Sequence, residues 1–252
     1  MIHFGVSVQW IGWMVQNRGM STTSLRQRFR ADVQAQIIAA AHAQMISEGA
    51  EAISLRAIAR QLGMAPSAVH GYFASRDDLL TALMIRQFNA LGQVLDAAEQ
   101  GVRNRSDYRA RVTALFLAER QFALSEPPTW SLLFGGPVPG YSEPAEVCDT
   151  AQHFVRLIVT IIEDATSAGI VFKQPASAWE PAPAALTDQP VGDAAALMSV
   201  MPAWQVATGL AAYSWMVGAI TAELRQMFAY FVSDYDAQYR AGVAHWVDAI
   251  GM

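Results

Sequence analysis

Apolar residues recur at intervals of three and four along most of this chain, which is the spacing of an amphipathic helix. After Ser54, this spacing places Leu55, Ile58, Ala59 and Leu62 on one helical face, where they can pack into a small core. Ser54 is a natural N-cap, because its side-chain oxygen can accept a hydrogen bond from an otherwise unpaired backbone N–H. The pattern therefore predicts a short helix directly after Ser54.

A tight turn and a second short helix follow. Gly63 ends the first helix, since glycine readily takes the positive φ angle of such a turn. Pro66 lies in the first turn of the next helix, where the N–H that proline lacks would be unpaired anyway. Val69 and Phe73 supply its inward face. Four residues are left pointing outward: Ser67, Ala68, His70 and Gly71. Two helices joined in this way predict a helix-turn-helix, whose second helix enters a DNA groove.

The remaining segments also predict helices, so the expected fold class is all-α. A stripe of Val33, Ile37, Ala41 and Met45 predicts a support helix over Asp32–Glu48. Further helices are expected over residues 76–100, 108–124, 129–134, 144–168 and 234–250. Residues 173–190 hold four prolines and no periodicity, which predicts a surface loop.

Residues 194–222 hold no charged side chain, which raises the alternative of a membrane span, since ~20 apolar residues suffice for one. Pro202, Gln205, Thr208 and Ser214 interrupt this stretch, and neither flank carries a Lys/Arg cluster. We interpret it as a helix buried between the core and a partner subunit. The last helix presents an apolar side made of Tyr235, Tyr239, Val243, Trp246 and Val247. The two helices are expected to pair with their copies as the four-helix interface of a homodimer.

Four short blocks carry a resemblance to a known family. They are ISLRAIA (residues 53–59), LGM (62–64), VHGYF (69–73) and SRDDLL (75–80). Together they resemble the N-terminal DNA-binding domain of the TetR family of bacterial regulators, over a region from about Ala31 to about Leu95. The sequence departs from the usual pattern at His70, where tyrosine is commoner, and at Arg76, where lysine is commoner. Both residues can still donate to phosphate oxygens.

The resemblance implies how the motif would contact DNA. Ser67, Ala68 and His70 would lie nearest base edges, and Ser54, Tyr72 and Arg76 would lie on phosphates. The full set of expected DNA-binding residues is Ser54, Arg56, Pro66, Ser67, Ala68, His70, Gly71, Tyr72 and Arg76. A two-fold symmetric dimer predicts a palindromic operator on double-stranded DNA.

The resemblance also implies the organisation of the chain. The expected parts are an N-terminal extension and basic arm (residues 1–30), a three-helix helix-turn-helix domain (31–77) and a larger helical ligand-binding and dimerisation domain (78–252). Segments 120–127, 130–134 and 215–218 resemble a C-terminal domain found in one branch of TetR-like regulators. The expected function is a transcriptional regulator, a repressor released by a small, largely apolar effector. Residues expected to line the effector cavity are Trp130, Phe134, Tyr141, His153, Phe154, Thr208, Trp215 and Met216.

Charge is unevenly placed along the chain. The 252 residues carry a net charge of -5, which argues against a general nucleic-acid coat protein. Met20–Arg30 holds three arginines and no acidic residue, and predicts a flexible basic arm that reaches DNA or, alternatively, a solvated tail. Residues 1–19 are apolar without the features of a secretory signal, and we assign them no function. The single Cys148 excludes a disulfide framework within one chain and suits the cytoplasm.

Catalytic constellations are nearly absent. The five histidines are scattered, and no Ser-His-Asp or Cys-His spacing stands out. Glu146, Asp149 and His153 would share a helical face and could ligate a divalent metal, but a solvated polar face explains them more simply. No cofactor or metal is therefore expected. Two alternatives stay open: a body that serves as a protein-interaction platform, and a small-molecule-binding protein or enzyme whose N-terminal helices only mimic the motif.

Overall fold

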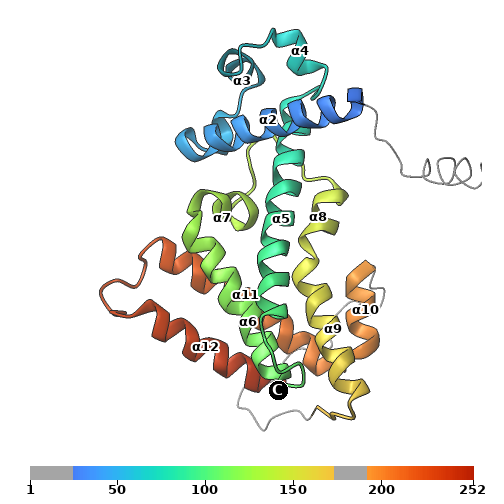
Figure 1. Ribbon diagram of the computed structural model, residues 1–252. Coiled ribbons are helices and arrows are strands. Elements are labelled where there is room, and N and C mark those ends of the chain that lie inside the picture. The colour runs from blue at the N-terminus through green and yellow to red at the C-terminus, as the bar shows by residue number, and fades with distance from the viewer. Residues whose placement is uncertain (1–24, 173–191) are drawn as a thin grey trace, which may run out of the picture.

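The computed structural model describes residues 25–172 and 192–252, and all regular structure in these two ranges is helical (Figure 1). The predicted all-α fold class is confirmed. The elements are α2 (Leu25–Glu48), a 3-10 turn η1 (Ala50–Ala52), α3 (Leu55–Gln61), α4 (Pro66–His70), α5 (Arg76–Gln100), α6 (Tyr108–Ser125), α7 (Pro127–Phe134), α8 (Ala145–Ala151), α9 (His153–Ser167), α10 (Gly192–Val200), α11 (Ala203–Leu224) and α12 (Tyr235–Ala249).

A small head is formed by α2, α3, α4 and the first turns of α5, and it lies at one end of the molecule (Figure 1). Its core is fully buried and includes Ile37 of α2, Ile58 and Ala59 of α3, Val69 of α4 and Leu80 of α5. The spacing of apolar residues in the sequence predicted this inward face of the two short helices, and the burial confirms it.

The turn between α3 and α4 depends on local hydrogen bonds. Ser54 caps α3, because its hydroxyl oxygen accepts from the backbone N–H of Ala57 at 3.4 Å. Gly63 has φ +65°, in the left-handed region that favours glycine. The N–H of Met64 then donates back to the carbonyl of Ala59 at 2.8 Å, which closes the end of the helix. These bonds fix the angle at which α4 leaves α3.

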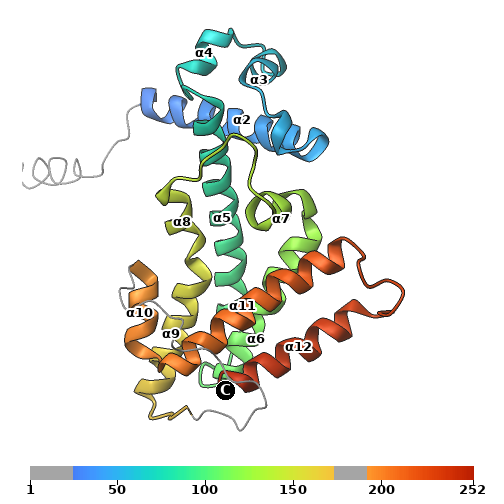
Figure 2. The same ribbon diagram turned by 180° about the vertical axis from the view of Figure 1, so that it is seen from behind.

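Helix α5 joins the head to the body (Figures 1 and 2). It begins with a capping box, in which Ser75 and Asp78 each bond the other's backbone N–H. Its first turns place Leu83 in the head core, and its later turns place Leu91 and Leu95 in the body core. A displacement of this helix is therefore transmitted to both cores.

The body surrounds the lower part of α5. Helices α8 and α9 flank it on one side, α6 and α7 on the other, and α11 and α12 cover the back (Figure 2). The stacked rings of Trp215 and Tyr239 join α11 to α12, with centroids 5.3 Å apart. A Cβ placed on Gly242 would lie 2.0 Å from Cζ2 of Trp215, so only glycine fits beneath this indole ring.

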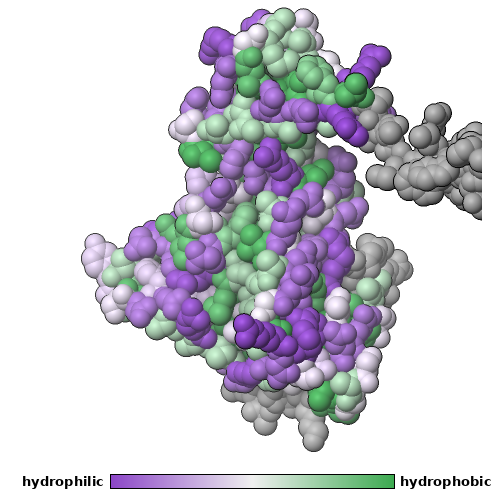
Figure 3. Space-filling view, in the orientation of Figure 1, coloured by the Kyte–Doolittle hydropathy of each residue, from purple (hydrophilic) through white to green (hydrophobic). Residues whose placement is uncertain are grey.

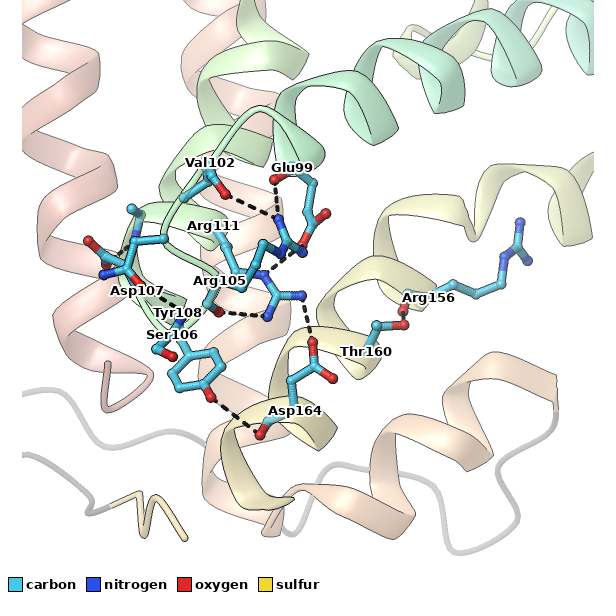
Figure 4. A network of polar contacts seen from close by, with 12 residues as sticks. Glu99, Val102, Arg105, Ser106, Asp107, Tyr108, Arg111, Arg156, Thr160 and Asp164 are labelled. Atoms are coloured by element: carbon cyan, nitrogen blue, oxygen red, sulfur yellow. Dashed lines mark hydrogen bonds and ion pairs between the residues drawn. The ribbon is translucent and has the colours of Figure 1, made fainter. Parts of the chain in front are cut away.

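A buried polar network holds the lower end of the body (Figure 4). Arg111 of α6 is 1% exposed, and its guanidinium donates to Glu99 of α5 at 2.6 Å and to Asp164 of α9 at 2.8 Å. Burial alone would lower the pKa of Arg111, but the hydrogen bonds to Asp164 and Glu99 outweigh it and raise that pKa. Arg105 pairs with the same Glu99 carboxylate. One arginine thus fastens three helices together.

A second network fastens the back of the body. Arg120 of α6 makes two hydrogen bonds of 2.7 Å with Glu223 of α11, and a further one of 2.7 Å with Asp236 of α12. Its guanidinium also lies 5.4 Å from the ring centroid of Tyr239. The bidentate geometry favours a fixed position of α11 and α12 on α6.

Three expectations from the sequence need correction. The basic segment is not an arm ahead of the first helix, because α2 already begins at Leu25 and contains all three arginines; residues 20–24 lie outside the described ranges. The single helix expected over residues 144–168 is divided at Gln152 into α8 and α9. The charge-free stretch is divided at Pro202, which serves as the N-cap of α11. The expected loop at residues 173–190 also lies outside the described ranges.

In the described part of the chain, none of the helices combines the length and the hydropathy that crossing a membrane would require. The surface agrees with this finding, because hydrophilic and hydrophobic residues are intermixed over the face seen in Figure 3.

Candidate functional site

The exposed end of the head is formed by α3 and α4. Pro66, Ser67, Ala68, His70 and Gly71 are all exposed, and they follow one another on α4 and its C-terminal end. Arg56 and Arg60 of α3 are also exposed and lie beside them in the motif. A short helix with small, uncharged side chains, flanked by arginines, can approach the floor of a DNA groove while the arginines meet phosphates.

His70 is held in a defined orientation on this surface. Its Nδ1 lies 3.3 Å from the carbonyl oxygen of Ala74, which can accept only. With the proton on Nδ1, Nε2 is left as an acceptor in the neutral ring and becomes a donor when the ring is protonated. The imidazole can therefore read a base edge or contact a phosphate.

Arg30 supports the end of α4 from the neighbouring helix α2. Its guanidinium donates to the carbonyl of Gly71 at 3.0 Å and lies 5.0 Å from the ring centroid of Tyr72. A cation at this position satisfies a carbonyl that α4 leaves unpaired at its C-terminus. The sequence did not indicate this contact, since it joins residues 41 positions apart.

The residues expected on phosphates differ in their freedom to bind them. Tyr72 is partly exposed beneath Arg30. Arg76 already donates to the carbonyls of Ala50 at 3.1 Å and Glu51 at 3.4 Å, so its first role is to tie η1 to α5. The Ser54 hydroxyl is engaged as the cap of α3. Ser54 therefore has the capping role that the sequence predicted, and Arg76 has a structural role that the sequence prediction had not included.

A largely apolar cavity of about 510 Å³ lies in the body, between α5, α6, α7, α8, α9 and α11. Its walls come from residues such as Phe88, Phe116, Phe134, Phe154, Val206 and Tyr213. Three ring contacts order this lining: Phe88 with Phe134, Phe116 with Phe154, and Phe154 with Tyr213, with centroids 5.8, 5.5 and 5.3 Å apart. A cavity of this volume and character suits a small apolar molecule.

The eight residues expected to line the cavity do not all meet there. Phe134 and Phe154 lie on its wall, and His153 lines a much smaller adjoining space. The sequence prediction missed Phe88, Phe116 and Tyr213, because periodicity marks them as apolar positions without showing where a void remains.

The other five residues lie away from this cavity. Trp130 is buried in the core, and its indole N–H lies 3.2 Å from the Thr221 hydroxyl. Met216 is likewise 0% exposed in the core. The Thr208 hydroxyl is bonded to its own helix, at the carbonyl of Trp204. Trp215 is stacked on α12, and the Tyr141 hydroxyl lies 2.9 Å from that of Thr81, at the base of the head.

The candidate metal ligands are also separated. Glu146 and Asp149 belong to α8, whereas His153 begins α9 and pairs through Nε2 with Asp96 at 2.9 Å. Among the residues that the structure describes, no group of histidine, cysteine or acidic side chains is arranged to hold a metal ion.

Three connections join the cavity to the head, and one of them is helix α8, which carries Cys148 on the cavity wall and Val147 in the head core. Helix α5 carries Phe88 on the cavity wall and continues into the head core. Helix α7 carries Leu133 and Phe134 on the same wall, and its Thr129 hydroxyl lies 2.9 Å from Nε2 of His42 on α2. A molecule that spreads these walls would therefore displace α5 and α7, and through them the head.

The outward surface of α11 and α12 differs from the interface that the sequence predicted. Tyr239, Val243 and Val247 are at most 3% exposed because they pack inside their own subunit. The side of α12 that faces outward carries small or polar residues, including Ala237, Ala241 and Ala244. Between the two helices, a protruding segment exposes Met227, Phe228, Tyr230 and Phe231 (Figure 1). Tyr230 and Phe231 are 98% and 90% exposed, which is unusual for adjacent aromatic side chains.

Two family models match this chain, one over the head and one over the body. A family model described as "Bacterial regulatory proteins, tetR family" matches residues 37–83, and one described as "Tetracyclin repressor-like, C-terminal domain" matches residues 112–246. The HTH-type transcriptional regulators Rv1816 of Mycobacterium tuberculosis and Mb1846 of Mycobacterium bovis are each 38% identical over 145 residues, which are 58% of this chain. The match spans 60% of the length of these relatives.

Solved structures show the same architecture. The regulatory protein SCO4313 superposes with a TM-score of 0.64 at 27% identity, over 89% of this chain and 100% of that one. A tetR family transcription regulator from Shewanella sp. PV-4 has a TM-score of 0.57 over 86% of this chain and 96% of that one, and at 16% identity it shows the fold alone.

Proposed function

The chain belongs to the TetR family of bacterial regulatory proteins, and from this premise we propose that it binds operator DNA as a homodimer and regulates transcription. The observation that carries the proposal is the pairing of an exposed α3–α4 surface with an apolar cavity, joined by α5. The proposed action is repression, released when a small apolar effector enters the cavity. Ligand binding can shift the position of the head only as far as the ligand's affinity differs between the two positions.

In the proposed complex, α4 lies in the major groove. Ser67, Ala68 and His70 face base edges, and Arg56, with Tyr72, faces phosphates. Pro66 and Gly71 limit the bulk at the two ends of α4, so the helix can lie deep in the groove. Arg30 holds the C-terminal end of α4 rather than reaching a second groove.

A truncation of His70 tests this docking. His70→Ala removes an exposed side chain, so the melting temperature should stay unchanged while operator binding weakens by about 1–3 kcal/mol, the range for one base contact. Gln93→Ala, an exposed truncation on α5 outside the head, is the matched control. Equal operator affinity of the His70 variant and the control would contradict the docking.

We further propose that the dimer forms through α11 and α12. The outward alanines of α12 allow a second helix to approach closely, and the protruding aromatic segment supplies apolar area for a partner to cover. The two-fold symmetry of such a dimer would place two heads on a palindromic operator. Phe231→Asp should shift the protein to a monomer in sedimentation velocity, whereas Val171→Asp, which replaces an exposed apolar residue beyond the end of α9, should not. If Phe231→Asp remained a dimer, the interface would have to lie on another surface of the protein.

The contact between His42 and Thr129 is the proposed route from effector to head, together with α5. His42→Ala breaks the bond between α2 and α7 without touching the DNA surface or the cavity. It should leave operator affinity nearly unchanged and weaken release by an effector. Release at the wild-type effector concentration would assign the coupling to α5 and α8.

A further inference from the structure

A carboxyl group without a partner lies behind the cavity. Glu119 of α6 is 0% exposed, and neither Oε1 nor Oε2 has a hydrogen-bond partner among the residues that the structure describes. A buried polar group in this condition costs free energy, because it has lost its hydrogen bonds to water and has formed none within the protein. A buried polar group that stays unsatisfied in a native structure requires an explanation, and one explanation is a ligand that binds it.

The position of Glu119 connects it to the cavity. It lines a space of about 10 Å³, enough for roughly one water-sized group. Phe88, Phe134, Phe154 and Tyr213 line both this space and the 510 Å³ cavity, so the carboxyl group lies beyond a shared aromatic wall. Movement of one of these rings would open the carboxyl group to the cavity.

The surroundings of Glu119 favour a cationic partner. Tyr213 lines the same small space as Glu119, and burial first, with the charge of Glu119 second, raises the pKa of its phenol. The other titratable groups facing it are Tyr239 and His153, and His153 is already bonded to Asp96. At the open side, Glu143 also lines the cavity and by its hydrogen bond raises the pKa of Cys148. Among the described residues, no lysine or arginine lines either space.

We propose that the effector is a hydrophobic amine, whose ammonium group is bound by Glu119 and whose apolar part fills the cavity. This inference rests on the proposed function, since it names the chemical class of the proposed effector. The ammonium group donates to the unpartnered oxygens of Glu119, and the faces of Phe88, Phe154 and Tyr213 add cation–π attraction. The apolar part replaces water against the lining of the cavity.

Binding should also displace a proton. Without ligand, burial raises the pKa of Glu119 to about 8, so the carboxyl group is protonated at pH 7. An ammonium group stabilises the carboxylate, and the proton of Glu119 passes to the solvent while the amine keeps its own. Net release of close to one proton per bound amine is therefore expected at pH 7.

Isothermal titration calorimetry with three matched probes tests the proposal: 4-phenylbutylamine, 4-phenylbutanol and 4-phenylbutanoate. They share one skeleton and differ in the charge of the head group. The full chain should bind the amine at least tenfold more tightly than the alcohol, with proton release seen as a dependence of the heat on the buffer. Glu119→Gln should bind amine and alcohol equally and release no proton. Glu163→Gln, an exposed control on α9, should behave as the wild type.

The outcomes separate this inference from the proposed function. Equal binding of amine and alcohol by the wild type, or no measurable binding of the amine, overturns the inference even where operator DNA is bound. The inference is also overturned if Glu143→Gln loses the preference for amine over alcohol and Glu119→Gln keeps it. The ammonium group would then be bound by Glu143 at the open side of the cavity. A preference for the amine without any operator binding would support the amine site at Glu119 and contradict the proposed function as a DNA-binding regulator. The melting temperature of Glu119→Gln verifies folding.

Discussion

The pH dependence of stability is a direct consequence of the buried Glu119. The folded protein raises the pKa of this group from 4.5 to about 8, through burial. The group therefore binds its proton more tightly in the folded state than in the unfolded state. Its contribution to the free energy of unfolding is fully present below pH 4.5 and is lost as the pH rises through about 8.

The magnitude follows from the size of the shift. One pKa unit corresponds to about 1.4 kcal/mol, so the contribution of Glu119 should fall by roughly 3 kcal/mol between pH 5 and pH 8. The glutamine of Glu119→Gln does not titrate, so this position contributes no loss of stability in the same range. The free energy of unfolding of the variant, relative to that of the wild type, should therefore rise steadily with pH.

Urea denaturation of both proteins at pH 5, 6, 7 and 8 measures this difference. The protein concentration must be the same throughout, because dimer stability depends on it. Other titrating groups contribute equally to both proteins, so the difference between the two curves reports Glu119. Glu163→Gln, which replaces an exposed carboxyl group, should follow the wild type. Parallel curves for Glu119→Gln and the wild type would refute the reasoning, since the carboxyl group would then be hydrated or paired.

Three further substitutions test the packing and the networks. Gly242→Ala places a methyl group against the ring of Trp215 and should lower the free energy of unfolding by about 1–3 kcal/mol in urea denaturation; an unchanged value would show that the indole moves without cost. Arg111→Met leaves Glu99 paired with Arg105 alone and should cost about 1.5–3 kcal/mol, measured in the same way, whereas a near-wild-type value would mean that the network contributes little. Arg76→Met loses the bonds that tie η1 to α5, so the melting temperature should fall along with operator affinity. A loss of affinity at an unchanged melting temperature would instead indicate that Arg76 contacts a phosphate.

Local signals in the sequence were sufficient to predict the head. The cap at Ser54, the turn at Gly63 and the inward positions Ile58 and Val69 each follow from properties of a few neighbouring residues. The same holds for the start of α5 at Arg76 and for the last helix, which differs from its expected range by one residue at each end. Such features depend on hydrogen bonds and spacing within about one or two helical turns.

Contacts between distant segments could not be predicted in the same way. An aromatic residue such as Trp130 or Phe134 has the same pattern whether it fills a core or lines a cavity, and only packing decides which. The side of α12 with Tyr239 and Val243 is apolar because it meets α6 and α11, not a partner. The burial of Glu119 could not be predicted from the sequence, because a glutamate within a helix usually faces water.

The central claim is that the exposed α3–α4 surface reads DNA sequence as part of a dimer. Selection of the purified full chain against a pool of random duplexes tests it most directly. We predict convergence on an inverted repeat whose half-sites lie about 10 base pairs apart, or a multiple of this, and affinity for it roughly 10³-fold or more above that for a scrambled duplex. Recovered duplexes without a common sequence, bound no more tightly than the scrambled duplex, would contradict the account.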